Sequence, residues 1–337
     1  MENLLIVSHS PHIASKDSVS RIMLDVIIAL IPALIAGCII FGMRALVVTF
    51  VCVFSCIASE YIWEKILKKP NTTGDLSAIV TGMLLAFNLP ASIPLWMAVI
   101  GSVFAIIVVK QFFGGIGHNF MNPALAARAF LVASWALAMT TWYAPGTALP
   151  LFGAPDAVTT ATPLAAADAI SSATPHANGG SAAFDYMTLF LGNTGGCIGE
   201  TSVLAILIGA AYLIIRKVIR IRVPLVFIAT VALGTWIFAG SEGIGSGDAL
   251  YHIMSGGLML GAFFMATDYT TSPTTPVGQI VFALGCGIIT VLIRVWGGYP
   301  EGVSYSILLM NVATPLIDKF TAPRRYGYVK PKKEVSA

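Results

Sequence analysis

Residues 22–41 read IMLDVIIALIPALIAGCIIF, a run in which Asp25 is the only charged side chain. About 20 consecutive apolar residues form a helix long enough to cross the hydrocarbon core of a bilayer. In all we expect about ten membrane-spanning helices, at residues 22–41, 45–63, 77–89, 93–110, 124–141, 201–215, 222–240, 250–266, 277–294 and 301–318. The third and sixth of these runs are short for full spans, and we expect half-helices or helices tilted against protein there.

The composition of the whole chain supports the same fold class. Of the 337 residues, 57% are hydrophobic and only 10% are charged, and the mean hydropathy is +0.85. A soluble globular domain is about 25% charged. The sequence therefore predicts an all-α polytopic membrane protein. Its net charge of +3 reflects how basic residues are distributed across the membrane, and it does not indicate a nucleic-acid partner.

The Lys and Arg residues predict the orientation. If both termini are cytoplasmic, 17 of the 19 basic residues, Arg128 among them, fall on the cytoplasmic side, and only Arg44 and Arg294 fall outside. Short cytoplasmic loops carry an excess of Lys and Arg in membrane proteins. We therefore expect cytoplasmic termini and an external loop at residues 142–200, which contains neither Lys nor Arg.

The two halves of the chain resemble each other. Residues 81–87 (TGMLLAF) are similar to residues 255–263 (SGGLMLGAF), and residues 121–124 (MNPA) to residues 310–313 (MNVA). Five spans per half is an odd number, so the repeats would be inverted, an arrangement that gathers polar sites near the bilayer midplane. Chance similarity between glycine-rich apolar segments is the alternative. The expected units are two five-helix repeats (1–141 and 201–318), the external loop (142–200) and a basic tail (319–337).

The external loop contains DAVTTATPL at residues 156–164. This stretch resembles the D-x-x-[ST]-G-A-T sequence of membrane subunits in the Rnf and sodium-pumping NADH:quinone oxidoreductase families, where FMN is attached through its phosphate to a threonine hydroxyl. The match assigns the attachment to Thr162. Thr160 stands where these families more often have glycine.

Further strings extend the resemblance over most of the chain. Their order and spacing are similar to those of the D subunits of Rnf complexes, which are ion-translocating ferredoxin:NAD oxidoreductases. The strings are SPH (10–12), DLSAIVTG (75–82), KQFFGG (110–115), NFMNPA (119–124), GETS (199–202), AFFMATD (262–268) and NVATPLID (311–318).

This resemblance implies a function in the cell membrane of a prokaryote. The chain would be one subunit of a redox-driven translocase, not catalytic alone, which relays electrons through covalently bound FMN and a second flavin while Na⁺ or H⁺ is moved. Its implied partners are flavoprotein and iron–sulfur subunits. The five cysteines of this chain are scattered, whereas an iron–sulfur cluster needs about four suitably spaced ligands.

Thr162 has a structural interpretation beside the functional one. It precedes Pro163 and the alanine-rich residues 164–170, a pattern typical of an N-cap followed by proline at the first helical position. The two interpretations are compatible, because a helix N-terminus offers free N–H groups to a phosphate. An exposed hydroxyl with small neighbours is all that a phosphoester link requires.

Asn119 and Asn122 lie three residues apart and would share one face of a helix. Amides both donate and accept hydrogen bonds, which suits the edge of a flavin ring. In the related quinone reductases a similarly placed N-x-x-N pair lies at a non-covalent riboflavin, so the resemblance implies a riboflavin site here. Capping of the next span by Asn122 is the alternative. Arg128, six residues further on, is expected to pair with a carboxylate or to lie near phosphate.

Asp268 is the candidate cation ligand. It ends AFFMATD and borders a stretch rich in Thr and Pro at residues 270–276. A broken helix with hydroxyl and carboxylate oxygens can bind a hard cation; an ordinary cytoplasmic loop is the alternative.

Two functional classes remain compatible with the sequence. The first is the flavin-bearing redox subunit. The second is a secondary transporter or channel for a small polar solute, which the repeat alone suggests.

Overall fold

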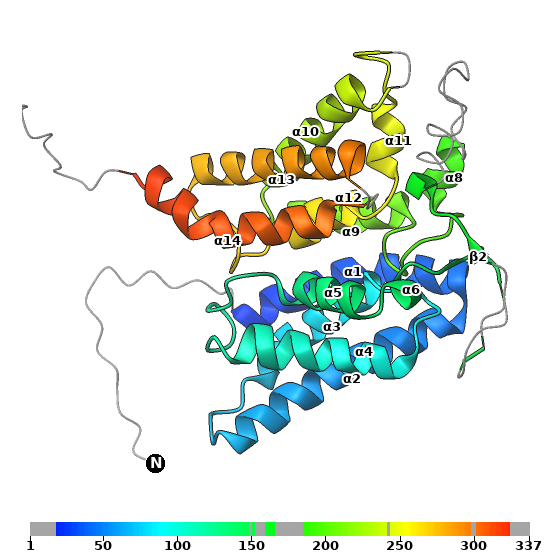
Figure 1. The fold of residues 1–337 in the computed structure, drawn as a ribbon. Helices are drawn as coiled ribbons and strands as arrows, with labels where there is room; N and C mark the ends of the chain where they lie inside the picture. The colour runs from blue at the N-terminus through cyan, green and yellow to red at the C-terminus, as the bar shows by residue number, and fades with distance from the viewer. Residues whose placement is uncertain are drawn as a thin grey trace, which may run out of the picture.

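The computed structural model describes residues 18–147, 150–151, 159–165, 185–240, 243–297 and 301–323. These residues form a helical bundle with one two-stranded antiparallel ribbon (Figure 1). The helices of the first part are α1 (Val19–Phe41), α2 (Met43–Ile66), η1 (Thr73–Asp75), α3 (Ser77–Phe87), α4 (Leu95–Val103), the π-helical η2 (Phe104–Gln111), α5 (Pro123–Ser134) and α6 (Ala136–Met139), and the ribbon joins β1 (Trp142–Tyr143) to β2 (Thr159–Thr160). The second part contains α8 (Tyr186–Leu191), α9 (Val203–Ile215), α10 (Arg222–Phe238), α11 (Ala249–Met254), α12 (Leu258–Leu260), the π-helical η3 (Gly261–Met265), α13 (Pro276–Trp296) and α14 (Val303–Thr321).

The prediction of an all-α polytopic membrane protein is confirmed. Helices α1, α2 and α13 are long and apolar enough to cross a membrane, and shorter apolar helices include α3, α5, α9 and α10. As expected, the third and sixth predicted spans are short, at 11 residues in α3 and 13 in α9. At a rise of about 1.5 Å per residue, neither covers a hydrocarbon core of about 30 Å.

Two predicted spans are interrupted. The prediction of a continuous helix at 250–266 is wrong: α11 ends at Met254, and the helix resumes at Leu258 after Gly256 adopts a left-handed conformation, with φ +67°. Arg294 of α13 donates to the carbonyls of His252 and Ser255 at this break, which satisfies backbone groups that lipid cannot. The predicted span at 124–141 likewise ends at Ser134, and Trp135 separates it from α6.

The helices pack in a similar pattern in the two halves. In the first, α2 packs on α3 and α4; in the second, α10 packs on α11 and α13. Between the halves, α1 contacts α9 and α5 contacts α14. In the amide orientation that satisfies its hydrogen bonds, Asn311 accepts from the backbone N–H of Asn122, so two residues that the sequence comparison aligned meet where the halves join. The inverted symmetry and the domain boundaries stay predictions.

The bundle has two distinct ends. In Figure 1, α1 begins and α14 ends on the left, whereas α6, α8, α11 and β2 lie on the right. We call the first the terminal end and the second the loop end. Arg44, at the start of α2, donates to the carbonyls of Pro150 and Leu151 at the loop end. Which end faces the cytoplasm stays a prediction from the basic residues.

Candidate functional sites at the two ends of the bundle

The segment around Thr162 is held against the loop end on both sides. Residues 159–160 pair with β1, and the Tyr251 hydroxyl of α11 donates to the Pro163 carbonyl at 2.7 Å. The Thr162 hydroxyl accepts a hydrogen bond from Ala165 N at 3.2 Å, and residues 163–165 form a helical turn. The capping role predicted for Thr162 is therefore confirmed. Its side chain remains partly exposed. Asp156, which begins the sequence motif, lies outside the described residues.

Thr162 lies on the wall of a cavity at the loop end. Two buried carboxyl side chains, Glu200 and Glu301, line the same cavity, together with Thr201 and Ser255. Glu200 belongs to the loop between α8 and α9, which enters the bundle and pairs with the end of α3 and the chain just after it: Ile198 N donates to Leu89 O, and Gly199 N donates to Phe87 O. We call this the loop-end cavity.

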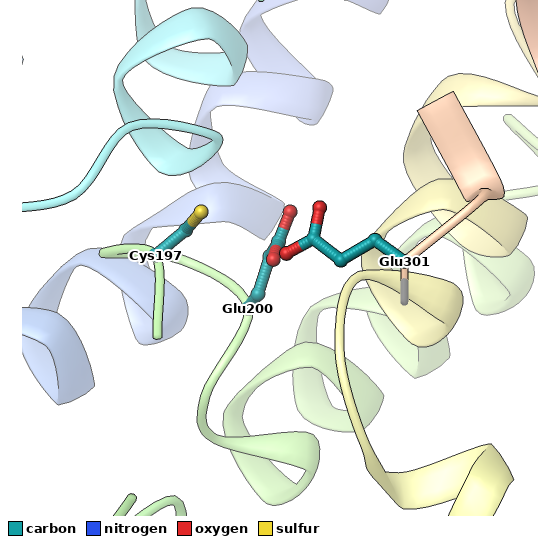
Figure 2. Close-up of side chains that lie close together, drawn as sticks. All are labelled: Cys197, Glu200 and Glu301. Carbon is teal, nitrogen blue, oxygen red and sulfur yellow. The ribbon is translucent and has the colours of Figure 1, made fainter. Parts of the chain in front are cut away.

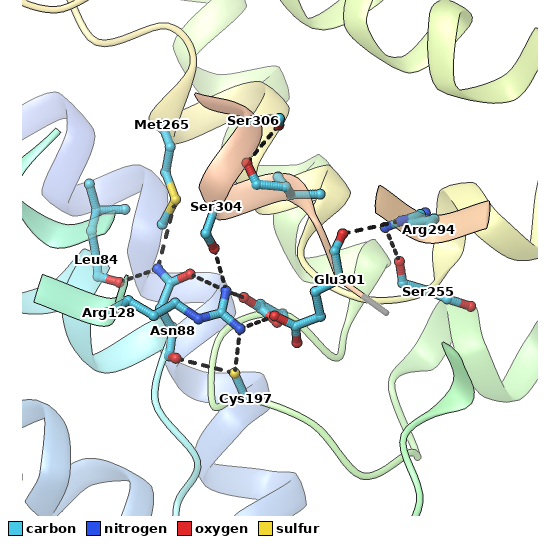
Figure 3. A network of polar contacts seen from close by, with 12 residues as sticks. Leu84, Asn88, Arg128, Cys197, Ser255, Met265, Arg294, Glu301, Ser304 and Ser306 are labelled. Atoms are coloured by element: carbon cyan, nitrogen blue, oxygen red, sulfur yellow. Dashed lines mark hydrogen bonds and ion pairs between the residues drawn. The ribbon is translucent and has the colours of Figure 1, made fainter. Parts of the chain in front are cut away.

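The buried Arg128 of α5 pairs with both carboxylates, and Figure 3 shows its guanidinium beside Glu301. Its Nη1 lies 3.1 Å from Glu200 Oε1, and its Nη2 makes a short contact with Glu301 Oε2. The guanidinium also donates to Ser304 Oγ at 2.8 Å, to Asn88 Oδ1 at 3.2 Å and to Cys197 Sγ at 3.8 Å. All of these residues are buried. A guanidinium thus joins α5, the chain beyond α3, the 192–202 loop and the start of α14.

Cys197, Glu200 and Glu301 together have the ligand types of a metal site (Figure 2). One ligand atom from each lies within 4.8 Å of the others. The guanidinium of Arg128 bonds to all three, however, so a positive charge already occupies the place a cation would take. The group is best described as an ion-pair network.

Of the two expectations for Arg128, pairing with a carboxylate is confirmed. Arg128 is buried inside the bundle and bonds to Glu200 of the loop predicted to be external, and its assignment to the cytoplasmic side stays a prediction. Glu200, Glu301 and Cys197 were missed as neighbours. No sequence motif links these residues to Arg128. The only indication in the sequence was that Glu200 belongs to the GETS string at 199–202.

A second cavity lies at the terminal end of the bundle and contains the other three candidate residues. Asn119, Asn122 and Asp268 all line it, with Lys110, Thr270 and the apolar side chains of Leu84, Ile219, Phe263 and Phe264. The asparagine pair and Asp268 were predicted as two separate sites, and the structure places them in one cavity. We call this the terminal-end cavity.

The polar groups of the terminal-end cavity form a chain of hydrogen bonds. Asn119 Nδ2 donates to Thr270 Oγ1 at 3.2 Å, and Thr270 Oγ1 lies 3.1 Å from both carboxylate oxygens of Asp268. Asn119 is only 7% exposed, and within the described residues its Oδ1 atom has no hydrogen-bond partner. Burying an unpaired amide oxygen is costly, so this atom is suited to accept from a ligand.

Asn122 has the capping role that the sequence left open. Its Oδ1 accepts from Ala124 N at 3.0 Å and from Leu125 N at 3.3 Å at the start of α5. The cap engages the amide oxygen, and the amide nitrogen of this cavity-lining residue keeps its capacity to donate.

Charge around the terminal-end cavity is mixed. Lys110 Nζ is buried and bonds to Glu60 Oε1 at 2.7 Å and to Ser77 Oγ at 2.5 Å. Asp268 lies in the loop after η3, where burial raises the pKa of its carboxyl, and hydrogen bonds from Thr270 and Thr271 lower it.

The two cavities lie at different depths along one helix. Asn122 caps the start of α5 and Arg128 follows six residues later, a rise of about 9 Å at 1.5 Å per residue. The structure brings Asn119, Asn122 and Asp268 together at the terminal end, and it brings Arg128 and Thr162 to the loop-end network and its cavity.

Comparison with known proteins identifies the family of this arrangement. The model described as the NQR2, RnfD, RnfE family matches residues 6–327. The chain belongs to this family. It is 54% identical to the D subunit of the Na(+)-translocating ferredoxin:NAD(+) oxidoreductase complex of Acetobacterium woodii, over 99% of this chain and 98% of the relative. It is 49% identical to the D subunit of the proton-translocating ferredoxin:NAD(+) oxidoreductase complex of Clostridium ljungdahlii, over 97% of both. The D subunit of the ion-translocating oxidoreductase complex of Stutzerimonas stutzeri is 40% identical over 93% of both.

Removing the Arg128 guanidinium is expected to destabilise the bundle strongly. In Arg128→Gln, two buried carboxylates lose their cation, a change that costs about 3–5 kcal/mol for buried pairs. Thermal unfolding in detergent measures the loss. Glu301→Gln in the same background should restore part of it, because one uncompensated charge is removed.

The matched control is Arg216→Gln. Arg216 also pairs with a carboxylate at 3.1 Å, that of Asp25, but its side chain is 49% exposed, and such pairs contribute about 1 kcal/mol or less. Equal destabilisation by the two substitutions would contradict a special role for the Arg128 network.

Proposed function

We propose that the chain is the membrane subunit of an ion-translocating ferredoxin:NAD oxidoreductase complex. The observation that carries this proposal is near full-length similarity to D subunits of such complexes. Relatives at 54% and 49% identity are named for Na⁺ and proton translocation respectively, so similarity alone does not choose the ion. The chain works with flavoprotein and iron–sulfur subunits and is not catalytic by itself.

In this proposal Thr162 carries FMN through a phosphoester. The fit rests on the local structure: the hydroxyl is partly exposed at the edge of a cavity and begins a helical turn. Backbone N–H groups at the start of such a turn favour a phosphate. After esterification Thr162 keeps oxygen acceptors for Ala165 N. The flavin would supply one- and two-electron chemistry; the chain supplies the tether, the loop-end cavity and the charges around it.

A second flavin, riboflavin, is proposed for the terminal-end cavity. Asn119 offers an unpartnered buried amide oxygen, and Asn122 offers an amide nitrogen whose oxygen is engaged in capping. The apolar side chains of Phe263, Phe264 and Leu84 suit an uncharged ring. If the loop end is external, flavins held by Thr162 and by the terminal-end cavity would lie at successive depths, where they would supply a route for electrons across the bilayer.

Asp268 is proposed to bind the transported cation near the second flavin. Its carboxylate is grouped with the hydroxyls of Thr270 and Thr271, and oxygen ligands of this kind suit Na⁺. The raised pKa of Asp268 also suits proton binding, so the site accommodates either ion named for the relatives.

The alternative function, a secondary transporter or channel, is favoured only by the similar packing of the two halves. A transporter has no reason to bind flavin. Flavin fluorescence of the protein band on a denaturing gel therefore separates the two functions.

The first prediction concerns the covalent flavin. Wild-type protein, co-expressed with a flavin transferase, should gain the mass of one esterified FMN, and Thr162→Ala should gain none because the attachment oxygen is lost. Intact mass and gel fluorescence measure this. Thr159→Ala and Thr160→Ala are the controls and should keep the flavin. A flavin still attached to the Thr162→Ala protein would refute the assignment.

The second prediction concerns the non-covalent flavin. Asn119→Ala combined with Asn122→Ser should release less free flavin than wild type on denaturing extraction. Serine keeps an oxygen for the cap of α5, so the helix is preserved while the amide nitrogen is removed. Full flavin stoichiometry in a folded double variant would argue against the site.

The third prediction concerns coupling. Asp268→Asn should slow ion transport in the reconstituted complex more than it slows ferredoxin-dependent NAD reduction, because it removes a charged ligand without removing a flavin contact. Parallel loss of both rates would indicate a structural role, and no change in either would make Asp268 an ordinary loop residue. Asp318→Asn is the control: this carboxylate accepts from Thr274 in an exposed position.

A further inference from the structure

The loop-end network consists of Arg128, Glu200, Glu301 and Cys197, and its two carboxylates make unequal contacts with the one guanidinium. Glu301 receives Nη2 through a short contact. Glu200 receives Nη1, which also donates to Ser304 Oγ and Asn88 Oδ1. Both carboxyl groups are more than nine-tenths buried, at 4% exposure for Glu200 and 6% for Glu301. Glu200 is therefore the more weakly neutralised of two like charges in a buried place.

Like charges held this close resist simultaneous ionisation. The ligand atoms of Glu200, Glu301 and Cys197 lie within 4.8 Å of one another, and two carboxylates that share a buried site raise the pKa of one of them. Glu301 has the closer contact with the guanidinium of Arg128, and Glu200 the longer one. Proton binding therefore falls on Glu200.

We propose that Glu200 is a proton-exchanging group of this protein, which takes up one proton when negative charge enters the loop-end cavity and gives it back when that charge leaves. The idea that an electron brings this charge rests on the proposed function; the exchange itself rests on the network.

The polar residues of the cavity wall offer a route for the proton. Glu200, Thr201 and the partly exposed Thr162 all line the same cavity. Thr201 is 8% exposed, and among the described residues its hydroxyl has no hydrogen-bond partner. A hydroxyl both donates and accepts, so it can pass a proton to a carboxylate. Gly257 leaves room beside Glu200, since a Cβ there would lie 2.7 Å from Oε1.

The charged and titratable groups around Glu200 come from its own loop, from α5, from α13 and from the residue before Gly302. Burial raises the pKa of its carboxyl; Arg128 of α5 lowers it, Glu301 before α14 raises it, and hydrogen bonding with Cys197 and the charge of Arg294 of α13 lower it. Arg294 donates to the carbonyls of His252, Ser255 and Glu301. Burial and the second carboxylate thus raise the pKa of the Glu200 carboxyl, whereas the two guanidinium groups lower it. This balance allows Glu200 to change its protonation state.

The exchange balances charge without moving an electron through Glu200. If a flavin on Thr162 gained one electron from reduced ferredoxin, the loop-end cavity would gain one negative charge. One proton from the loop end converts the Glu200 carboxylate to a carboxylic acid. When the electron leaves for the next acceptor, the acid loses that proton. No bond other than the O–H bond forms or breaks at Glu200.

Infrared spectroscopy of the purified complex tests the proposal in two steps. First, the oxidised complex is titrated across neutral pH, and the C=O stretch of protonated carboxyl groups is followed. Second, difference spectra are recorded on reduction. Wild type should show a carboxyl band that titrates with one proton and that grows on reduction. Glu200→Gln should lose both signals, and Glu200→Asp should keep a band that is shifted.

Glu64→Gln is the matched control. Glu64 is also a buried glutamate, but it accepts hydrogen bonds from Thr72 and does not line the loop-end cavity, so its loss should leave the band unchanged. Thr201→Val should slow the appearance of the band after rapid reduction and leave its final amplitude unchanged, which a merely structural Thr201 would not do.

The outcomes separate this proposal from the flavin assignment. If the carboxyl band titrates in oxidised Thr162→Ala protein but no longer grows on reduction, both the proton exchange at Glu200 and the flavin on Thr162 are supported. If the wild-type protein carries no flavin but its carboxyl band still titrates, the proposal for Glu200 stands and the flavin assignment is refuted. The proposal is overturned if wild type shows no titrating carboxyl band. It is also overturned if the band survives in folded Glu200→Gln. If Glu200→Gln does not fold, an unshifted band in Glu200→Asp overturns it.

Discussion

The structure depends on how one buried positive charge is satisfied. Arg128 lies inside a membrane protein at 3% exposure, where an uncompensated guanidinium would be very costly. Its partners come from three other segments: Asn88 beyond α3, the 192–202 loop, and the start of α14 with Glu301 and Ser304. The network can form only if the two halves of the chain and the inserted loop are all in place. A buried ion pair adds little net stability, so we interpret the network as a device that specifies one arrangement.

Helix α5 relates the two candidate sites to each other. Its first turn is capped by Asn122 beside the terminal-end cavity, and its middle carries Arg128 beside the loop-end network. A rigid helix keeps the two sites at a constant separation, which the proposed relay between them would require. The short and interrupted helices around α5 also contribute to these sites. Short helices such as α3 and interrupted ones such as α11 and α12 end inside the bundle, where their backbone ends are available to polar side chains.

Several features were predictable because they depend on local sequence. Apolar runs of the right length predicted the fold class and nearly every helix, and the Thr-Pro pair predicted the cap at Thr162. The break at residues 255–257 was missed, although two adjacent glycines mark it, because its neighbours are as apolar as those of a continuous span. The pairing of Arg128 with a carboxylate was expected, but the identity of the carboxylates was not, since Glu200 and Glu301 lie 72 and 173 residues away.

The sequence by itself determined the membrane environment, the positions of most helices and the residues worth considering at each site. Hydrophobicity and capping act over one or two helical turns, so a single segment contains the information. Only the tertiary structure decided which of these residues meet: Asn119 with Thr270 and Asp268 in one cavity, and Thr162 with Glu200 and Glu301 in the other. Those meetings arise from helices packing across the bundle and from a loop that enters it, and no local pattern records where a distant segment will lie.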